Sequence, residues 1–528
     1  MNLSNKLSMV INVIMIMLSL SMYVGLDGGF AVDRFLAIGG AESSTLSFSV
    51  LIRKAIFIFE YICAFSILIM LTYYHNWKGF VWLGCLSFLF FMDSCCFVVY
   101  GRPADIFNIS MLIDSAANIK EAIGMYFSVI FKEGILTILC FLPLVVSVYL
   151  NRVKGNRIRG GGILVLTIIL FFIYFITVVF RGGPVTIGFP KGFSFLFGCV
   201  TSEFNKVTSK EEYANVINFD MPIDIKNVVF IIDESISYDE VSGKIEKIDT
   251  DNKIFNFGKT ISAANCSATS NYILRKGVQE KVSGKFRLLE TSSVFEIAKQ
   301  NKYHTYYIDA QGVLKDNNVR NYFTDHEIGY IDKTIDLSSV PLIDRDRAIP
   351  DIVQGLNRDD DNKFIFINKV GAHFPYKSHL PAHDITNNNM DNYRKVLDRN
   401  VIYVVKQLID NIDDKTVIFY TSDHGQNFDG GATHCNSGSS IRKEEYYVPF
   451  FIITSNKYVI DRIKAVNNIK PNHFFITESV RNLLGGEVVG VPSLFKDRKK
   501  TNHNMSICGI WGQPIKFFGK EPYCINVD

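Results

Sequence analysis

The chain has 528 residues and a formal net charge of +3, with 48% hydrophobic residues and a mean hydropathy of +0.16. This length is too great for one small domain, and the near balance of charge gives no electrostatic argument for binding nucleic acid. The positive hydropathy is high for a soluble protein, and almost all of the apolar excess lies before about residue 180. We therefore expect a membrane part followed by a water-soluble part.

Five apolar segments in the first part are each long enough to cross a membrane. They cover approximately residues 7–26, 54–74, 80–100, 127–150 and 162–180. The connection after the fourth segment, residues 151–159, carries four basic residues and no acidic one, so we expect it in the cytoplasm. Counting spans from there places the N-terminus inside and everything after residue 180 outside.

Two connections face outward in this topology, and the second, residues 101–126, is rich in polar residues. Its residues Asp114, Ser115, Asn118 and Glu121 have the spacing of one face of an amphipathic helix. This stretch is either an interfacial helix with solvated polar side chains or a binding site for a lipid head group.

Residues 181–225 form a linker that begins with several glycines and prolines. Residues 193–200 within it are apolar and short, which indicates a helix along the membrane surface. From residue 226 to 528, strand-like runs alternate with helical patterns, as in an α/β domain with a largely parallel sheet. We thus predict a membrane domain (1–180), a linker (181–225) and an α/β domain (226–528).

Two apolar runs of strand type each end in residues that bind metal ions. Residues 227–232 lead through one aspartate to Glu234, and residues 416–420 are followed closely by Asp423 and His424. Ligands of open α/β sheets lie at the carboxyl ends of the strands. Two strands that end in carboxylates and an imidazole therefore predict one metal site at that edge of the sheet.

The loop 265–271 between these strands carries small hydroxyl residues just before a helical pattern. Exposed backbone N–H groups at a helix start favour an anionic phosphate. Thr269 or Ser270 could act as a nucleophile if a metal ion lowers the pKa of the hydroxyl. The alternative is a simple helix cap, for which serine, threonine and asparagine are the preferred residues.

Two further histidines, His373 and His434, lie in polar loops of the α/β domain. Neither has zinc-finger spacing, so any metal or substrate site would have to be assembled from distant loops. Among the cysteines of this domain, Cys508 and Cys524 close a short terminal loop and are the first choice for a disulfide bond.

Several of these motifs together resemble the phosphoethanolamine transferases, a family of the alkaline phosphatase and sulfatase superfamily. The motifs, in chain order after the apolar segments, are Glu234, the loop 265–271, Gly371–Ala372–His373 and Ser422–Asp423–His424–Gly425. The resemblance covers nearly the whole chain. It implies five transmembrane helices followed by a sulfatase-like domain with a central, mostly parallel sheet.

The resemblance also implies a Zn²⁺ ion held by Glu234, Asp423, His424 and the nucleophilic hydroxyl. The usual family pattern has a threonine four residues after the cysteine of the loop, and that position here is Ser270. Ser270 is therefore the predicted nucleophile and metal ligand, with Thr269 as the alternative.

Residues implied in substrate binding are less directly matched by the family motifs. They are His373, Lys315 and Glu121, with Asn118 and His434 as further candidates. The chain also departs from the colistin-resistance members, which have histidines at the positions of Asn368 and Tyr447. It has Gln426 in place of a frequent acid, and Leu274–Arg275 in place of a proline–cysteine pair. These departures favour the branches that modify core sugars or periplasmic glucans over the lipid A branch.

The function implied by the resemblance is a multi-pass enzyme of the bacterial inner membrane with its catalytic domain in the periplasm. It would transfer phosphoethanolamine from phosphatidylethanolamine to lipopolysaccharide or another periplasmic glycan through a covalent phospho-enzyme. One alternative is a glycerophosphate transferase of the lipoteichoic acid synthase type. Another is a non-catalytic membrane protein that binds lipid or glycan. The acceptor and the number of zinc ions stay open.

Overall fold

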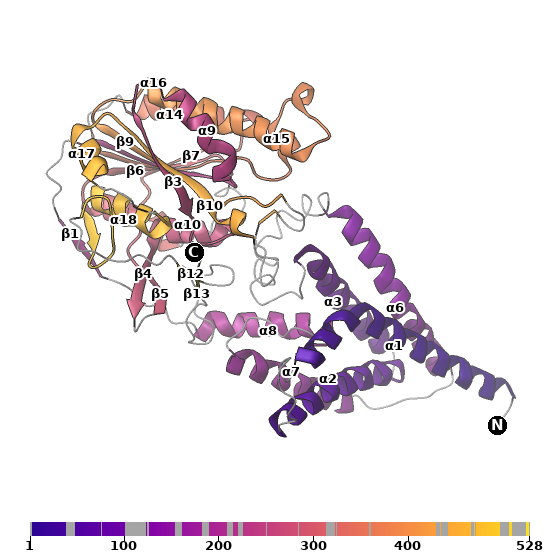
Figure 1. Cartoon of the computed structure of the whole chain (residues 1–528). Helices are drawn as coiled ribbons and strands as arrows, with labels where there is room; N and C mark the ends of the chain where they lie inside the picture. The colour runs from indigo at the N-terminus through magenta and orange to yellow at the C-terminus, as the bar shows by residue number, and fades with distance from the viewer. Residues whose placement is uncertain are drawn as a thin grey trace. The chain divides into compact units, whose positions relative to one another are not determined.

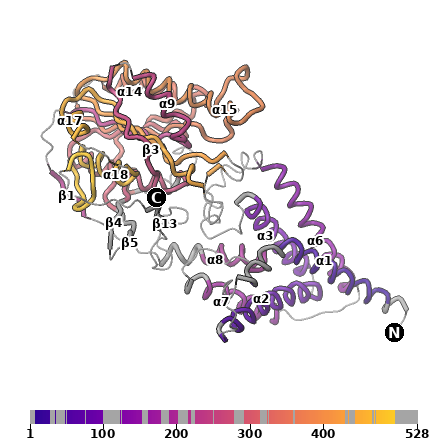
Figure 2. The backbone as a smooth tube through the Cα atoms, viewed as in Figure 1, coloured from indigo at the N-terminus to yellow at the C-terminus, as the bar shows by residue number. Residues whose placement is uncertain are grey.

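The computed structural model of the chain divides into two compact units (Figure 1). The first, here called the helical unit, contains residues 1–209 and 517–520, and the second, the α/β unit, contains residues 210–516 and 521–528. The backbone is traced in Figure 2, and the structure describes the residues drawn in colour in Figure 1. These are residues 3–37, 48–74, 77–100, 123, 126–153, 161–181, 189–208, 215–219, 225–249, 251–282, 285–312, 323, 325–357, 361–428, 433–434, 442–465, 469, 471–496, 506–508 and 524–526.

The described part of the helical unit consists of long apolar helices. They are α1 (Leu3–Ala37), α2 (Phe48–Thr72), α3 (Lys78–Tyr100), α6 (Phe127–Val153), α7 (Gly161–Arg181) and α8 (Phe193–Thr208). Four of them, α1, α2, α3 and α6, contain stretches of 21 to 26 residues that are long and apolar enough to cross a membrane. The fifth predicted span coincides with α7, of which the stretch Gly161–Thr177 is a shorter apolar helix. The number of spans beyond four stays a prediction.

Polar side chains link the apolar helices to one another. Asn12 of α1 donates from Nδ2 to Asn151 Oδ1 of α6 at 3.1 Å, and Ser147 Oγ of α6 donates to Asn12 Oδ1. Further along the same two helices, Ser19 Oγ donates to the carbonyl of Cys140. Hydrogen bonds of this kind hold helices together where lipid leaves no hydrophobic driving force between them.

The segment before α8 is anchored to the same bundle. Tyr23 donates from its hydroxyl to the Lys191 carbonyl at 2.6 Å, and Lys191 Nζ donates to the Leu26 carbonyl at 2.8 Å. Gly192 N lies 3.3 Å from Asp93 Oδ2 on α3. The predicted helix of the linker is therefore present as α8, and its start is fixed to α1 and α3 within the helical unit.

The α/β unit is built on a seven-stranded sheet with the order β3-β10-β9-β2-β8-β6-β7. The strands are β2 (Asn227–Asp233), β3 (Ile254–Ile261), β6 (His304–Asp309), β7 (Lys333–Asp336), β8 (Lys363–Asn368), β9 (Thr416–Ser422) and β10 (Tyr447–Thr454). The five strands from β9 to β7 pair in parallel, and β10 pairs antiparallel with both β9 and β3. The predicted largely parallel sheet is confirmed.

Helices cover both faces of this sheet (Figure 1). One face carries α9 (Tyr238–Ile248), α14 (Arg345–Leu356), α15 (Asn389–Val396), the π-helix η5 (Leu397–Ile402) and α16 (Tyr403–Asp410). The other carries α10 (Ser267–Lys276), α11 (Val294–Gln300), α17 (Lys457–Ala465) and α18 (His473–Leu483). In β2, Val229 and Ile231 face the first layer, and Val228 and Phe230 face the second. Burial on both sides explains why this strand reads as a continuous apolar run.

Smaller described elements complete the unit. They are the pairs β1 (Val216–Asn218) with β11 (Gly486–Val488), β4 (Gly277–Val282) with β5 (Lys285–Glu290) and β12 (Ser506–Cys508) with β13 (Cys524–Asn526), the helix α13 (Asp325–Ile328), and the 3-10 turns η2 (Leu342–Asp344), η3 (Tyr376–His379), η4 (Ala382–Asp384) and η7 (Lys443–Glu445).

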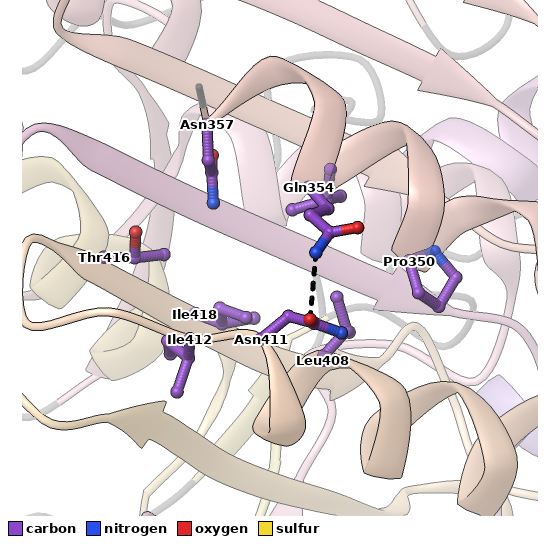
Figure 3. A pocket seen from close by; sticks show the side chains of 9 residues that line it. Pro350, Gln354, Asn357, Leu408, Asn411, Ile412, Thr416 and Ile418 are labelled. Atoms are coloured by element: carbon purple, nitrogen blue, oxygen red, sulfur yellow. Dashed lines mark hydrogen bonds between the residues drawn. The ribbon is translucent and has the colours of Figure 1, made fainter. Parts of the chain in front are cut away.

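A small pocket lies between α14 and α16, beside the start of β9 (Figure 3). Gln354 Nε2 donates to Asn411 Oδ1 across it at 2.9 Å, and Thr416, the first residue of β9, lines it. Its volume of about 10 Å³ holds at most one water molecule. The pocket is thus too small for a substrate, and it lies at the opposite end of β9 from the predicted metal ligands.

Candidate metal centre

The carboxyl ends of β2 and β9 bring three of the four predicted metal ligands together. The two strands are parallel neighbours, and Asp233 pairs with Ser422 at the end of their register. Glu234 follows the first strand, and Asp423 and His424 follow the second. All three side chains are buried, and their ligand atoms lie within 4.8 Å of one another. We call this set the metal centre.

The hydrogen bonding of Asp423 fits a bound cation. Its Oδ1 accepts from the backbone N–H groups of Ser235 at 3.0 Å and His424 at 2.7 Å. Its Oδ2 is buried, has no hydrogen-bond partner among the described residues, and lies 3.6 Å from His424 Nε2. A buried carboxylate oxygen without a partner is costly, and a metal ion would satisfy it.

The imidazole of His424 is oriented for the same role. Its Nδ1 lies 2.7 Å from the Gly425 carbonyl, which can only accept, so Nδ1 carries the proton and Nε2 faces the carboxylates. Nε2 is 3.4 Å from Glu234 Oε1. Two carboxylate ligands and one imidazole make a donor set that suits Zn²⁺.

Burial and mutual charge shift the pKa values of all three ligands. Burial and the charge of Glu234 raise the pKa of Asp423 to about 8. Burial alone would lower the pKa of His424, but the charges of Asp423 and Glu234 outweigh it and raise this pKa to about 9. Burial would raise the pKa of Glu234, but its hydrogen bond to His424 and that residue's charge lower it. A cation that binds at neutral pH must therefore displace protons from Asp423 and His424.

A hydroxyl group at the start of α10 completes the centre, and it belongs to Ser267. Ser267 Oγ donates to Glu234 Oε1 at 3.0 Å and lies 3.1 Å from His424 Nε2. The residue is the first of α10, directly after Cys266 at the N-cap position. It thus combines contact with the metal ligands and a position among the free N–H groups of a helix start.

The structure does not bring Ser270, the predicted nucleophile, to the metal centre. Ser270 Oγ donates to the Ala264 carbonyl at 3.1 Å instead, and both Ser270 and Thr269 are buried. The family spacing counted from Cys266 points to Ser270, but the helix begins immediately after Cys266, so Ser267 is its first residue and is the hydroxyl residue that contacts Glu234 and His424. The feature of the sequence that could have indicated this hydroxyl is the serine directly after Cys266, the N-cap residue of α10.

Two of the predicted substrate-binding residues lie beside the metal centre. The rings of His434 and His424 stack with their centroids 4.3 Å apart, and His373 lies 6.0 Å from His434 by the same measure. Burial and the charges of His424 and His373 hold the pKa of His434 well below its usual value, so it is neutral at pH 7. The other three candidates, Lys315, Asn118 and Glu121, lie outside the described residues.

Comparison with known proteins identifies the domain that carries this centre. The family model described as Sulfatase matches residues 226–486. Residues 226–486 form a sulfatase-family domain. Comparison with curated protein sequences gives no match.

The chain is similar to several solved structures. The integral membrane protein lipooligosaccharide phosphoethanolamine transferase A (EptA) from Neisseria meningitidis has a TM-score of 0.58 at 11% identity, over 90% of this chain and 96% of that chain. The periplasmic domain of EptC from Escherichia coli in complex with Zn has a TM-score of 0.46 at 17% identity, over 60% of this chain and 96% of that chain. The lipoteichoic acid synthase LtaP from Listeria monocytogenes has a TM-score of 0.35 at 15% identity, over 56% of this chain and 80% of that chain. The likeness to EptA confirms the predicted fold class, apolar helices followed by a sulfatase-family domain.

Two residues of the sulfatase-family domain, Gln311 and His473, support the centre without having been predicted. Gln311 Nε2 donates to Glu234 Oε2 at 3.1 Å and to the Lys369 carbonyl at 2.8 Å. His473 Nε2 lies 2.9 Å from the Ser422 carbonyl, and its Nδ1 accepts from Ala263 N at 3.2 Å. Burial lowers the pKa of His473 to about 3, so this neutral ring ties the end of β9 to the loop before α10.

Cys266, the N-cap residue of α10, is in a disulfide bond. The cysteines that the structure describes as thiols, outside any disulfide bond, all lie in the helical unit. They are Cys63, Cys85, Cys95, Cys96, Cys140 and Cys199. The strands β12 and β13 place Cys508 directly opposite Cys524. This register agrees with the predicted bond between those two cysteines, which stays a prediction.

Proposed function

We propose that the chain is a membrane-anchored, zinc-dependent phosphoethanolamine transferase. The observation that carries this proposal is the position of Ser267 Oγ, in contact with Glu234 and His424 at the start of α10. A hydroxyl held between metal ligands at a helix N-terminus suits attack on a phosphate ester. The apolar helices of the same chain suit a lipid donor, because they confine the enzyme to the membrane that contains it.

The metal ion would be held by Glu234, Asp423, His424 and Ser267. Their nitrogen and oxygen donors match the ligand types of catalytic zinc sites. When bound, zinc lowers the pKa of a ligated hydroxyl and stabilises negative charge on the phosphate oxygens. Gln311 and the Gly425 carbonyl hold Glu234 and His424 in orientation.

The first half of the reaction transfers phosphoethanolamine from phosphatidylethanolamine to the protein. A bond forms between Ser267 Oγ and phosphorus, and the bond between phosphorus and the glycerol oxygen of the lipid breaks. The hydroxyl proton leaves through Glu234, whose Oε1 already accepts a hydrogen bond from Oγ, and the departing diacylglycerol oxygen gains a proton from solvent. Neutral His434 and the nearby His373 are placed to donate hydrogen bonds to the phosphate.

The second half transfers the group from Ser267 to an acceptor. A hydroxyl or phosphate oxygen of lipopolysaccharide or another periplasmic glycan attacks phosphorus, and Ser267 Oγ is released and regains its proton. The proposed location is therefore the bacterial inner membrane, with the sulfatase-family domain in the periplasm.

A transfer assay with the full-length chain in lipid vesicles tests the donor. We expect label in the ethanolamine head group of phosphatidylethanolamine to reach a glycan acceptor in the presence of Zn²⁺, and Glu234→Gln to abolish transfer. Label moving instead from the glycerol head group of phosphatidylglycerol would favour a glycerophosphate transferase. Transfer of neither label by the wild type would contradict the proposal and favour a binding protein.

A further inference from the structure

A buried lysine lies next to the metal centre. Lys369 follows β8 and is fully enclosed, with its ammonium group donating to Asp233 Oδ2 and, at 2.7 Å, to the Asn400 carbonyl. Its Nζ is 3.8 Å from Asp346 Oδ2. Asp233 and Asp346 are each only 1% exposed. We call these three charged residues the Lys369 triad.

Asp233 connects the triad to the segments that carry the metal ligands. Its Oδ1 accepts from the backbone N–H of Glu234 at 3.0 Å. Its carbonyl accepts from the backbone N–H of Asp423 at 2.9 Å and from Ser422 Oγ at 3.1 Å. The position of Asp233 therefore sets the backbone on both sides of the metal centre.

Asp346 connects the triad to the loop that carries His373. Its two oxygens accept from Val370 N and Gly371 N, each at 2.9 Å. The backbone N–H of the next residue, Ala372, donates to the Glu234 carbonyl at 2.9 Å. Lys369 thus lies between two carboxylates, each of which fixes one of the loops that meet at Glu234.

The chemistry of these bonds indicates a role beyond stability. Apolar side chains of similar volume often stabilise a protein core as well as a buried ion pair does. Hydrogen bonds to charged groups, however, fix the orientation of the groups that make them. Groups that orient metal ligands in this way strongly affect the affinity for the metal ion. In this triad the oriented groups are the backbone of Glu234 and the loop before His373.

We propose that Lys369 is a positioning residue for the metal centre, which it holds in its binding geometry through Asp233 and Asp346. This inference rests on the metal centre of the proposed function, although it does not depend on the substrate. Lys369 makes no contact with Glu234, Asp423 or His424 side chains among the described interactions, so it acts through its two carboxylate partners.

The variant Lys369→Met tests the proposal in the full-length chain. We expect the Kd for Zn²⁺, measured by competition with a chelator, to rise about 10- to 100-fold, as is typical for groups that orient metal ligands. The matched control is Arg481→Met, which breaks the Arg481–Glu478 pair of α18, also fully buried. This control should lower the Tm measured without zinc and leave the Kd for Zn²⁺ unchanged.

The double variant Asp233→Asn with Lys369→Met separates positioning from charge compensation. It leaves no uncompensated carboxylate at position 233 and keeps an oxygen that can accept from Glu234 N. We expect its Tm to recover relative to Lys369→Met and its Kd for Zn²⁺ to stay raised. A Kd equal to that of the wild type, in either Lys369 variant, would overturn the proposal.

The two proposals can fail separately in these measurements. A wild-type chain that binds Zn²⁺ and shows the expected pattern of Kd values, yet transfers no phosphoethanolamine, would contradict the proposed function alone. A wild-type chain that binds no Zn²⁺ would contradict both. Equal weakening of Zn²⁺ binding by Lys369→Met and Arg481→Met would contradict the positioning role alone.

Discussion

At the scale of single residues, two ligands of the metal centre, Asp423 and His424, bind protons that a metal ion must displace. The pKa of Asp423 is raised to about 8 by burial and the charge of Glu234, and the pKa of His424 is raised to about 9 by its carboxylate neighbours, against burial. Both groups hold protons below these pH values, and a cation must displace them. We therefore expect Zn²⁺ affinity to rise with pH through this range and to level off above about pH 9. Chelator competition across the range measures it, and a flat profile would contradict the assigned ligands.

Gly371 is a second residue on which the geometry of the centre depends. Its φ of 58° lies in the left-handed region, and a Cβ there would approach Asp233 Oδ1 and the Glu234 carbonyl to 2.4 Å. We expect Gly371→Ala to lower the free energy of unfolding by about 1–3 kcal/mol and to weaken Zn²⁺ binding. Gly355→Ala in α14 is the matched control, because nothing lies within 4 Å of its Cβ position. Chemical denaturation compares the two, and equal stability would contradict the close packing of this loop.

At the scale of elements, the strands were predictable and the helix start was not. The apolar runs at residues 227–232 and 416–420 correspond to β2 and β9, since strands buried on both faces leave a continuous apolar pattern. The three metal ligands followed from the ends of those strands. Ser267 did not follow, because residue spacing does not show where α10 begins. Lys369 was also missed, because a lysine after a strand usually lies in solvent.

The N-terminal end of α10 also carries a disulfide bond, through Cys266. Ser267 follows Cys266 and lies 3.1 Å from His424, on whose ring His434 stacks. Cys435, the residue after His434, lies outside the described residues. With Cys508 opposite Cys524, we expect the pairs Cys508–Cys524 and Cys266–Cys435. Peptide mapping without reduction tests this pairing, and a peptide that links Cys266 to either terminal cysteine would contradict it.

At the scale of the whole molecule, one chain combines apolar helices with a sulfatase-family domain. Composition and sequence pattern together predicted a membrane part and an α/β part, because the apolar excess ends near residue 180 and strand–helix alternation begins near residue 226. The similarity to EptA extends over 90% of this chain, so it includes both parts. The branch that the sequence resembles and the acceptor rest on a few loop residues, and they stay predictions from the sequence.

The most direct test of the central claim is the intact mass of the full-length chain, in vesicles of phosphatidylethanolamine with Zn²⁺. We predict a phosphoethanolamine adduct that Ser267→Ala abolishes and that Ser270→Ala and Thr269→Ala retain, because only Ser267 Oγ contacts Glu234 and His424 among these hydroxyls. An adduct that persists in Ser267→Ala and disappears in Ser270→Ala or Thr269→Ala would contradict the assigned nucleophile. The absence of an adduct from every version would contradict the covalent mechanism itself.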